Sequence, residues 1–302
     1  MPSDLAPLAP QPVAYSATHR GLPLLAGVLA AACFVSMDSI IKLLSPRYDA
    51  LQLSFFRFAS GSVFAVMLWL WQRSALPTRA AWKLHIARSL FLLVSLVSYF
   101  HALTQLPLAL AVTISYLTPI LVSALAIPIL KERPGRAIWW ALAMGVAGVL
   151  VSLLPELRAS LDTTNAGHLL GMGSAAVGAL AFAFVMLLAR RQSRSDSPWT
   201  IVLVQNVLAL ALLAPPAAMT WRPLHNTDFG LIVLAGALGT AGLLNLTYAF
   251  RHLEASRVAP LEYTGFVWAT LLGYLLFGEV PTLNTAASAA FIIGGCLLLV
   301  RW

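Results

Sequence analysis

The chain consists almost entirely of apolar stretches that are each long enough to cross a lipid bilayer. A membrane-spanning helix needs about 20 mostly apolar residues, because the hydrocarbon core is about 30 Å thick and each residue adds about 1.5 Å. Ten such stretches take up nearly all of the 302 residues and leave no room for a sizeable soluble domain. The expected spans are 22–44, 51–71, 84–106, 107–130, 137–154, 167–190, 199–220, 228–252, 256–278 and 282–300.

Composition agrees with a membrane protein, and the basic residues predict its orientation. Charged residues make up only 10% of the chain, whereas soluble domains carry about 25%. Thirteen lysines and arginines fall on one side of the predicted spans and three on the other. Short cytoplasmic loops retain basic residues, so the richer side is predicted to be cytoplasmic, with both termini. The net charge of +8 is therefore interpreted as a topology signal and not as a nucleic-acid site.

Two further features bear on processing and on metal binding. Residues 1–20 are rich in Pro and Ala and lack a basic segment before an apolar core, so we expect a disordered tail and not a signal peptide. Cys33 and Cys296 both fall inside predicted spans. They are expected to be buried apolar side chains, which leaves no disulfide or metal framework.

The sequence contains an internal repeat at a constant offset of 147 residues. At this offset Tyr116 aligns with Tyr263, Glu132 with Glu279, and Gly148 with Gly295. The repeat pairs the fourth and fifth spans with the ninth and tenth, so each half holds five spans. Since five is odd, the second half enters the membrane inverted, an arrangement that places a substrate site at the repeat interface.

The repeated segments ALAVTISYLTPILVSALAIPILKERP and VAPLEYTGFVWATLLGYLLFGEVP give the chain a family resemblance. It resembles EamA-type carriers of the drug/metabolite transporter superfamily, from about residue 22 to the end. The usual Gly-Glu pair is complete only in the second half, because Lys131 stands where the second half has Gly278. The resemblance implies ten helices around a central cavity and transport of small metabolites, including amino acids, nucleotide derivatives and S-adenosylmethionine.

We therefore predict an all-α membrane protein of ten transmembrane helices in two inverted five-helix repeats (5+5). The first repeat is placed at 21–154 and the second at 155–302. No lysine follows a Gly-rich phosphate loop, and neither H-E-x-x-H nor G-x-S-x-G occurs. We expect no catalytic residue, no cofactor and no ATP hydrolysis, although a membrane enzyme or scaffold remains an alternative.

Ionisable residues inside spans are costly in lipid and usually face a partner or water. Asp38, Lys42 and Arg57 belong to the predicted periplasmic half, and Arg88 and Glu262 to the cytoplasmic half. We interpret the two groups as the outer and inner gates of a carrier, or as contacts for the two ends of a zwitterion. The alternative is a set of fixed ion pairs that orient helices, with long side chains reaching the interface.

Polar aromatic and amide side chains supply candidate substrate contacts, because they offer hydrogen bonds without the burial cost of a charge. The alternative for these residues is interhelical hydrogen bonding or an interfacial aromatic belt. Two prolines that interrupt spans are candidate hinges. The substrate-binding candidates are Tyr99, Tyr116, Tyr263, Trp268, Arg57, Asn245 and Tyr248, and the hinge candidates are Pro119 and Pro260.

The sequence thus predicts a secondary transporter of the bacterial inner membrane that exports amino acids by alternating access. A carrier of S-adenosylmethionine or a nucleotide-type metabolite is the alternative. The expected partners are a small-molecule substrate and membrane lipid, without nucleic acid, and a monomer is the expected unit.

Overall fold

The structure, a computed structural model, describes residues 21–106, 108–161, 166–219, 221–278 and 280–301. In these ranges the chain forms helices and no strand. Seven of the described helices are long and apolar enough to cross a membrane, and 136–152 and 283–299 are shorter apolar helices. The predicted tail 1–20 and the repeat residue Glu279 lie outside the described residues.

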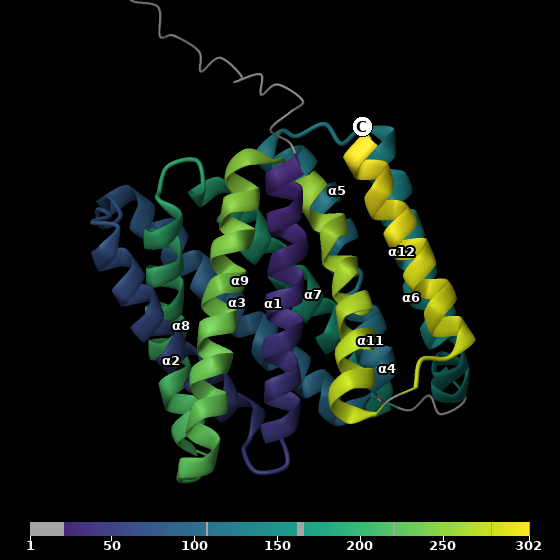
Figure 1. The fold of residues 1–302 in the computed structure, drawn as a ribbon, viewed down its shortest axis with the longest axis horizontal. Helices are drawn as coiled ribbons and strands as arrows, with labels where there is room; N and C mark the ends of the chain where they lie inside the picture. The colour runs from purple at the N-terminus through teal and green to yellow at the C-terminus, as the bar shows by residue number, and fades with distance from the viewer. Residues whose placement is uncertain (1–20, 107, 162–165, 220, 279, 302) are drawn as a thin grey trace, which may run out of the picture.

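The helices follow one another through short loops (Figure 1). In chain order they are α1 (Gly21–Leu44), α2 (Ala50–Trp71), α3 (Arg79–Gln105), α4 (Leu108–Ser115), α5 (Thr118–Leu130), α6 (Arg136–Leu161), α7 (Ala166–Gln192), α8 (Pro198–Met219), the short 3-10 helix η2 (Asn226–Asp228), α9 (Phe229–His252), α10 (Ala255–Val258), the 3-10 helix η3 (Ala259–Tyr263), α11 (Thr264–Phe277) and α12 (Leu283–Arg301).

Two of the expected spans are broken in the middle. The fourth is divided into α4 and α5, with Pro119 in the first turn of α5. The ninth is divided into α10, η3 and α11, with Pro260 in the first turn of η3. Proline lacks an N–H group and fits best in the first turn of a helix, where Pro119 and Pro260 begin new helical segments.

Local backbone geometry recurs at the offset of 147 residues. Lys131 closes α5 with φ 57°, and its repeat mate Gly278 closes α11 with φ 67°. Likewise Leu106 and Leu253 are both extended caps, and their N–H groups donate to the carbonyls of Ala102 and Ala249. A left-handed cap suits glycine better than lysine, so the cap of α11 has the lower backbone cost.

The helices pack as pairs that join distant parts of the sequence. At the two edges of the molecule α2 packs against α8, and α6 against α12 (Figure 1). Between them α1 packs against α9 and α11, and α7 against α3 and α5. The broken helices therefore lie next to the centre of the molecule, where α1 and α7 pass.

Glycine brings α2 and α9 close enough for contacts between side chains and main chain. A Cβ atom at Gly236 would lie 1.8 Å from Ser60 Oγ and 2.6 Å from the Gly61 nitrogen. Ser60 Oγ donates to the Ile232 carbonyl (2.9 Å), and Thr240 Oγ1 donates to the Gly61 carbonyl (3.2 Å). Small residues at the contact thus permit the interhelical hydrogen bonds that hold membrane helices together.

The outer surface is apolar, as a lipid-facing surface must be. Leu169, Leu170 and Leu275 are 65%, 67% and 63% exposed, and many other large apolar side chains project outward from the described helices. A monomeric protein in water rarely exposes so much contiguous apolar surface. The protein is therefore a multi-pass membrane protein.

Replacing Gly236 should loosen the α2–α9 contact. We expect Gly236→Ala to lower the free energy of unfolding in detergent by about 1 to 3 kcal/mol, because the added methyl group overpacks the contact. Gly230→Ala in the same helix is the control, since a Cβ there meets nothing within 4 Å. Thermal unfolding of both variants would contradict the packing if Gly236→Ala were as stable as Gly230→Ala.

The predicted orientation places the loop after α1 outside the cell and the loop after α7 inside. In a background without Cys33 and Cys296, a cysteine at exposed Ser45 should react with an impermeant maleimide on intact cells. A cysteine at exposed Ser195 should react only after permeabilisation. Ser193 is unsuitable because it is 2% exposed. The reverse labelling pattern would invert the topology.

Candidate functional site

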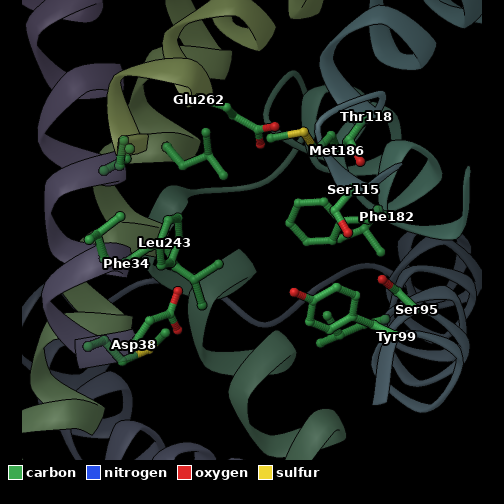
Figure 2. Close-up of a pocket in the computed structure, with 18 of the residues that line it drawn as sticks. Phe34, Asp38, Ser95, Tyr99, Ser115, Thr118, Phe182, Met186, Leu243 and Glu262 are labelled. Carbon is green, nitrogen blue, oxygen red and sulfur yellow. The ribbon is translucent and has the colours of Figure 1, made fainter. Parts of the chain in front are cut away.

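A cavity of about 730 Å³ lies at the centre of the protein, among helices from both halves of the chain (Figure 2). Its lining residues come from α1 to α5 in the first half of the chain and from α7, α8, α9, α10, η3 and α11 in the second half. Most of the surface is apolar or aromatic, as in typical small-molecule sites. The aromatic lining residues are Phe34, Phe58, Tyr99, Tyr116, Phe182 and Phe277.

Asp38 and Arg57 are opposite charges within interaction range in the part of the cavity lined by α1 and α2. Asp38 retains exposed surface, and its carboxylate is directed into the cavity (Figure 2). The Arg57 guanidinium carbon lies 4.4 Å from the centre of the Phe58 ring, and Lys42 Nζ lies 4.2 Å from that of Phe277. Aromatic faces thus stabilise both cations.

Arg88 lines the same cavity from α3 and is only 2% exposed. Its Nη1 donates to Gln192 Oε1 of α7 over 3.0 Å. Its Nε is buried and has no acceptor among the described residues. The guanidinium is therefore oriented by one hydrogen bond and keeps a second donor unused.

Glu262 enters the cavity from η3, where the ninth predicted span is broken (Figure 2). Among the described residues it forms no hydrogen bond and no ion pair. The neighbouring Tyr263 is fixed, because its hydroxyl donates to the Tyr116 carbonyl over 3.0 Å. The Glu262 carboxylate thus lies next to a tyrosine whose position is fixed by a hydrogen bond.

The structure brings Tyr99, Tyr116 and Pro119 to the cavity together with the five charged candidates, and the Tyr99 hydroxyl points into it (Figure 2). It does not bring the other candidates there. Tyr263 is 1% exposed and packs behind Tyr116, against Gly145. Pro260 is buried behind the lining.

Three second-half candidates also lie away from the cavity. Asn245 Nδ2 donates to the Ala241 carbonyl of its own helix (2.9 Å), and the Tyr248 ring lies 4.3 Å from that of His252. Trp268 is half-buried and is absent from the lining. None of these three is among the lining residues, and their contact with substrate stays a prediction.

Several lining residues were not singled out as site candidates. Phe34, Phe182, Ser115 and Thr118 contribute to the wall and carried no distinguishing signal, because they sit in uniformly apolar or small-residue stretches. Gln205 is 3% exposed and lines the cavity, and its Nε2 has no acceptor among the described residues. It belongs to the amide side chains inside spans that the sequence favours for a cavity.

On the predicted cytoplasmic side, a polar contact that we call the Glu132 clamp joins the end of α5 to α7 and α10. Glu132 accepts hydrogen bonds from the Ala255 nitrogen (3.0 Å), the Ser256 nitrogen (3.1 Å) and Ser256 Oγ (3.0 Å). Arg190 Nε lies 3.5 Å from the same carboxylate, and Arg190 also donates to the Phe250 carbonyl. A carboxylate that caps the free N–H groups of a helix start is stabilised by charge and by hydrogen bonding.

On the opposite side, the Asp228 clamp joins the loop after α1 to η2. Arg47 Nη1 lies 2.7 Å from Asp228 Oδ1, and the Tyr48 hydroxyl donates to Oδ2 over 2.9 Å. Gln52 Nε2 donates to the Arg222 carbonyl nearby (2.6 Å). Polar contacts between the first and the second half of the chain therefore occur on both predicted sides of the protein.

Within the described residues, no group of three or more His, Cys, Asp or Glu side chains is placed to hold a metal ion. The cavity instead offers aromatic faces, single hydrogen-bond donors and charges of both signs. This donor set suits an organic molecule with both a cationic and an anionic group.

Comparison with known proteins gives two matches to one family within this chain. The sequence profile of the EamA-like transporter family matches residues 21–154 and again residues 169–301. A solved structure described only as a crystal structure of a protein superposes with a TM-score of 0.78 at 22% identity, covering 92% of this chain and 98% of that chain. That likeness shows the fold.

Two curated relatives are similar over most of their length. The pseudopaline exporter CntI of Pseudomonas aeruginosa is 28% identical over 277 residues, which cover 92% of this chain and 95% of the exporter. The S-adenosylmethionine uptake transporter of Rickettsia prowazekii is 24% identical over 264 residues, which cover 87% of each protein.

The Glu132 clamp yields a test of how the halves are held. We expect Glu132→Gln to lower the free energy of unfolding by about 2 kcal/mol, because the amide removes a charge that accepts from buried N–H donors. Glu254→Gln is the matched control. Burial and the nearby charge of Glu132 raise the pKa of the Glu254 carboxyl, so its charge is already disfavoured in the fold. Equal melting curves for the two variants in detergent would contradict the clamp.

Proposed function

This chain belongs to the EamA-like transporter family, and on that premise we propose that it exports an amino-acid-type metabolite across the bacterial inner membrane. Movement is by alternating access through the central cavity, without ATP. The protein acts as a carrier and not as an enzyme. Its partners are the small-molecule substrate and membrane lipid, and both of its termini are cytoplasmic.

The pairing of helices supports the proposed 5+5 inverted architecture, with repeats at 21–154 and 155–302. Exchanging the two halves turns the α1–α9 contact into α7–α3, α1–α11 into α7–α5, and α2–α9 into α8–α3, all of which occur. The α2–α8 and α6–α12 pairs exchange into themselves. Such a pattern is what a two-fold axis in the membrane plane produces.

The positions of the cavity and the clamps support alternating access. The cavity is lined by both halves, and one polar contact between the halves lies on each predicted side of the protein. A carrier needs one end to open while the other stays closed, and separate clamps allow this. The breaks after α4 and η3 supply backbone points where the spans beside the cavity can bend.

The substrate class rests on one observation above all, which is a largely apolar and aromatic cavity that holds charges of both signs. Aromatic walls suit an organic side chain, and the charges suit an ammonium and a carboxylate. The volume of about 730 Å³ falls in the range of sites for drug-sized ligands, so an amino-acid derivative fits better than the smallest amino acids.

S-Adenosylmethionine is the second candidate. It contains an amino-acid head and a purine ring, and a relative carries its name as a transported substrate. The aromatic lining offers surfaces on which a purine could stack.

Transport by the purified protein tests the proposal. In protein-only liposomes, a panel of radiolabelled amino acids, amino-acid derivatives and S-adenosylmethionine should include a compound that moves downhill and shows counterflow. Tyr116→Ala should lower the rate at least tenfold, whereas Trp199→Ala, outside the cavity lining, should leave it within about twofold. Export predicts faster uptake into inside-out than into right-side-out vesicles.

If only S-adenosylmethionine is transported, the second candidate replaces the first. If no member of the panel shows counterflow, the proposed substrate class is wrong.

A further inference from the structure

Two ionisable side chains of the cavity lining lack an ion-pair partner among the described residues. The described charged residues of its lining are Asp38, Lys42, Arg57, Arg88 and Glu262. Asp38 and Arg57 interact with each other, and Lys42 lies against the Phe277 ring. Neither Arg88 nor Glu262 forms an ion pair with a described residue.

An isolated charge at this depth is expensive, because neither lipid nor an apolar wall replaces the hydration that it loses. Arg88 and Glu262 do not cancel each other, although both face one cavity. They come from α3 and η3, which belong to different halves of the chain. A molecule with one negative and one positive group would compensate both charges at once and would connect the two halves.

The surroundings of Arg88 show which group of such a molecule binds there. Its Nε–H has no acceptor among the described residues, although the side chain is 2% exposed. Gln205 lines the same cavity at 3% exposure, and its Nε2 also lacks an acceptor. Buried donors are nearly always satisfied in folded proteins, so the unused donors of these two lining residues are candidates for an acceptor from outside the chain.

Gln192 orients this arrangement. Its Oε1 accepts from Arg88 Nη1 over 3.0 Å, which fixes the guanidinium by one edge. Gln192 is fully buried at 0% exposure, so it acts as a positioning residue and does not line the cavity. The guanidinium is held in place before the substrate arrives, which lowers the entropic cost of binding.

We propose that Arg88 and Gln205 bind the carboxylate of an α-amino-acid-type zwitterion and that Glu262 binds its ammonium group. The carboxylate accepts from Arg88 Nε–H and from the Gln205 amide, and the ammonium donates to the Glu262 carboxylate. This assignment rests on the proposed transport function and gives Arg88 and Glu262 the role of substrate contacts. Arg57, which already has Asp38 as a counter-charge, is not the carboxylate site.

Pairs of probes that differ by one charge test the assignment. Competition for counterflow in protein-only liposomes is measured with S-adenosylmethionine and its decarboxylated form, and with methionine, N-acetylmethionine and 3-(methylthio)propylamine. The wild-type protein should prefer each carboxylate-bearing probe over its decarboxylated partner by about 10- to 100-fold, the effect of one hydrogen-bonded charge. It should prefer methionine over N-acetylmethionine by a similar factor.

Each variant should remove one preference and keep the other. Arg88→Gln should bring the carboxylate preference to about one while the ammonium preference persists, and Glu262→Gln should do the reverse. Gln205→Leu should reduce the carboxylate preference severalfold, and Arg88→Lys should restore part of it. Arg57→Gln should leave both ratios unchanged even if overall affinity falls. A merely structural role for these residues would weaken all probes equally, because a ratio is insensitive to the fraction of folded protein.

The proposal is overturned if Arg88→Gln or, should that variant fail to fold, Gln205→Leu keeps the full carboxylate preference. It is also overturned if Arg57→Gln abolishes that preference. If the wild-type protein binds none of the probes, the proposed function fails first, and this result is distinguishable because it appears before any variant is compared.

Discussion

A charge inside a bilayer has no water to stabilise it, so the protein or its ligand has to provide the partner. This requirement organises the described structure. At each end of the molecule, charged groups are satisfied by the opposite half of the chain, through Glu132 on one side and Asp228 on the other. In the centre, Arg88 and Glu262 line the cavity without an ion-pair partner among the described residues. Polar groups thus join the halves at the ends, and we propose that they bind substrate between them.

Both the clamps and the cavity have an upper limit on how strongly they can bind. A clamp that was too strong would lock the carrier in one state, whereas a cavity that bound substrate too tightly would not release it. The Glu132 clamp combines hydrogen bonds to the start of α10 with one longer contact of 3.5 Å to Arg190. Its donors belong to a four-residue helix next to a 3-10 segment, an element short enough to shift as a unit. We therefore propose that the broken span moves during opening while the unbroken helices stay rigid.

Much of the fold could be predicted from the sequence because its signals are long-range and repetitive. The offset of 147 residues predicted equivalent positions, and Lys131 and Gly278 indeed share a left-handed cap. The direction of side chains could not be predicted in the same way. Tyr116 and Tyr263 are equivalent in sequence, yet one lines the cavity and the other supports it from behind. In uniformly apolar helices no periodicity distinguishes the cavity face from the packed face, so Phe34 and Phe182 carried no signal. The positions of charged side chains could be predicted better than those of aromatic ones. The cost of burying a charge restricts such a side chain to the few places where it meets a partner or the cavity.

The central claim is that the two halves alternate around one cavity, and the most direct test is a pair of distances measured on the same preparation. Spin labels at Ser45 and Thr227 report on the Asp228 clamp, and labels at Lys131 and Ser195 report on the Glu132 clamp. Pulsed electron paramagnetic resonance in liposomes, with and without a transported compound, should show the two distances changing in opposite directions, one widening as the other shortens. Two distances that both stay fixed, or that widen together, would contradict alternating access.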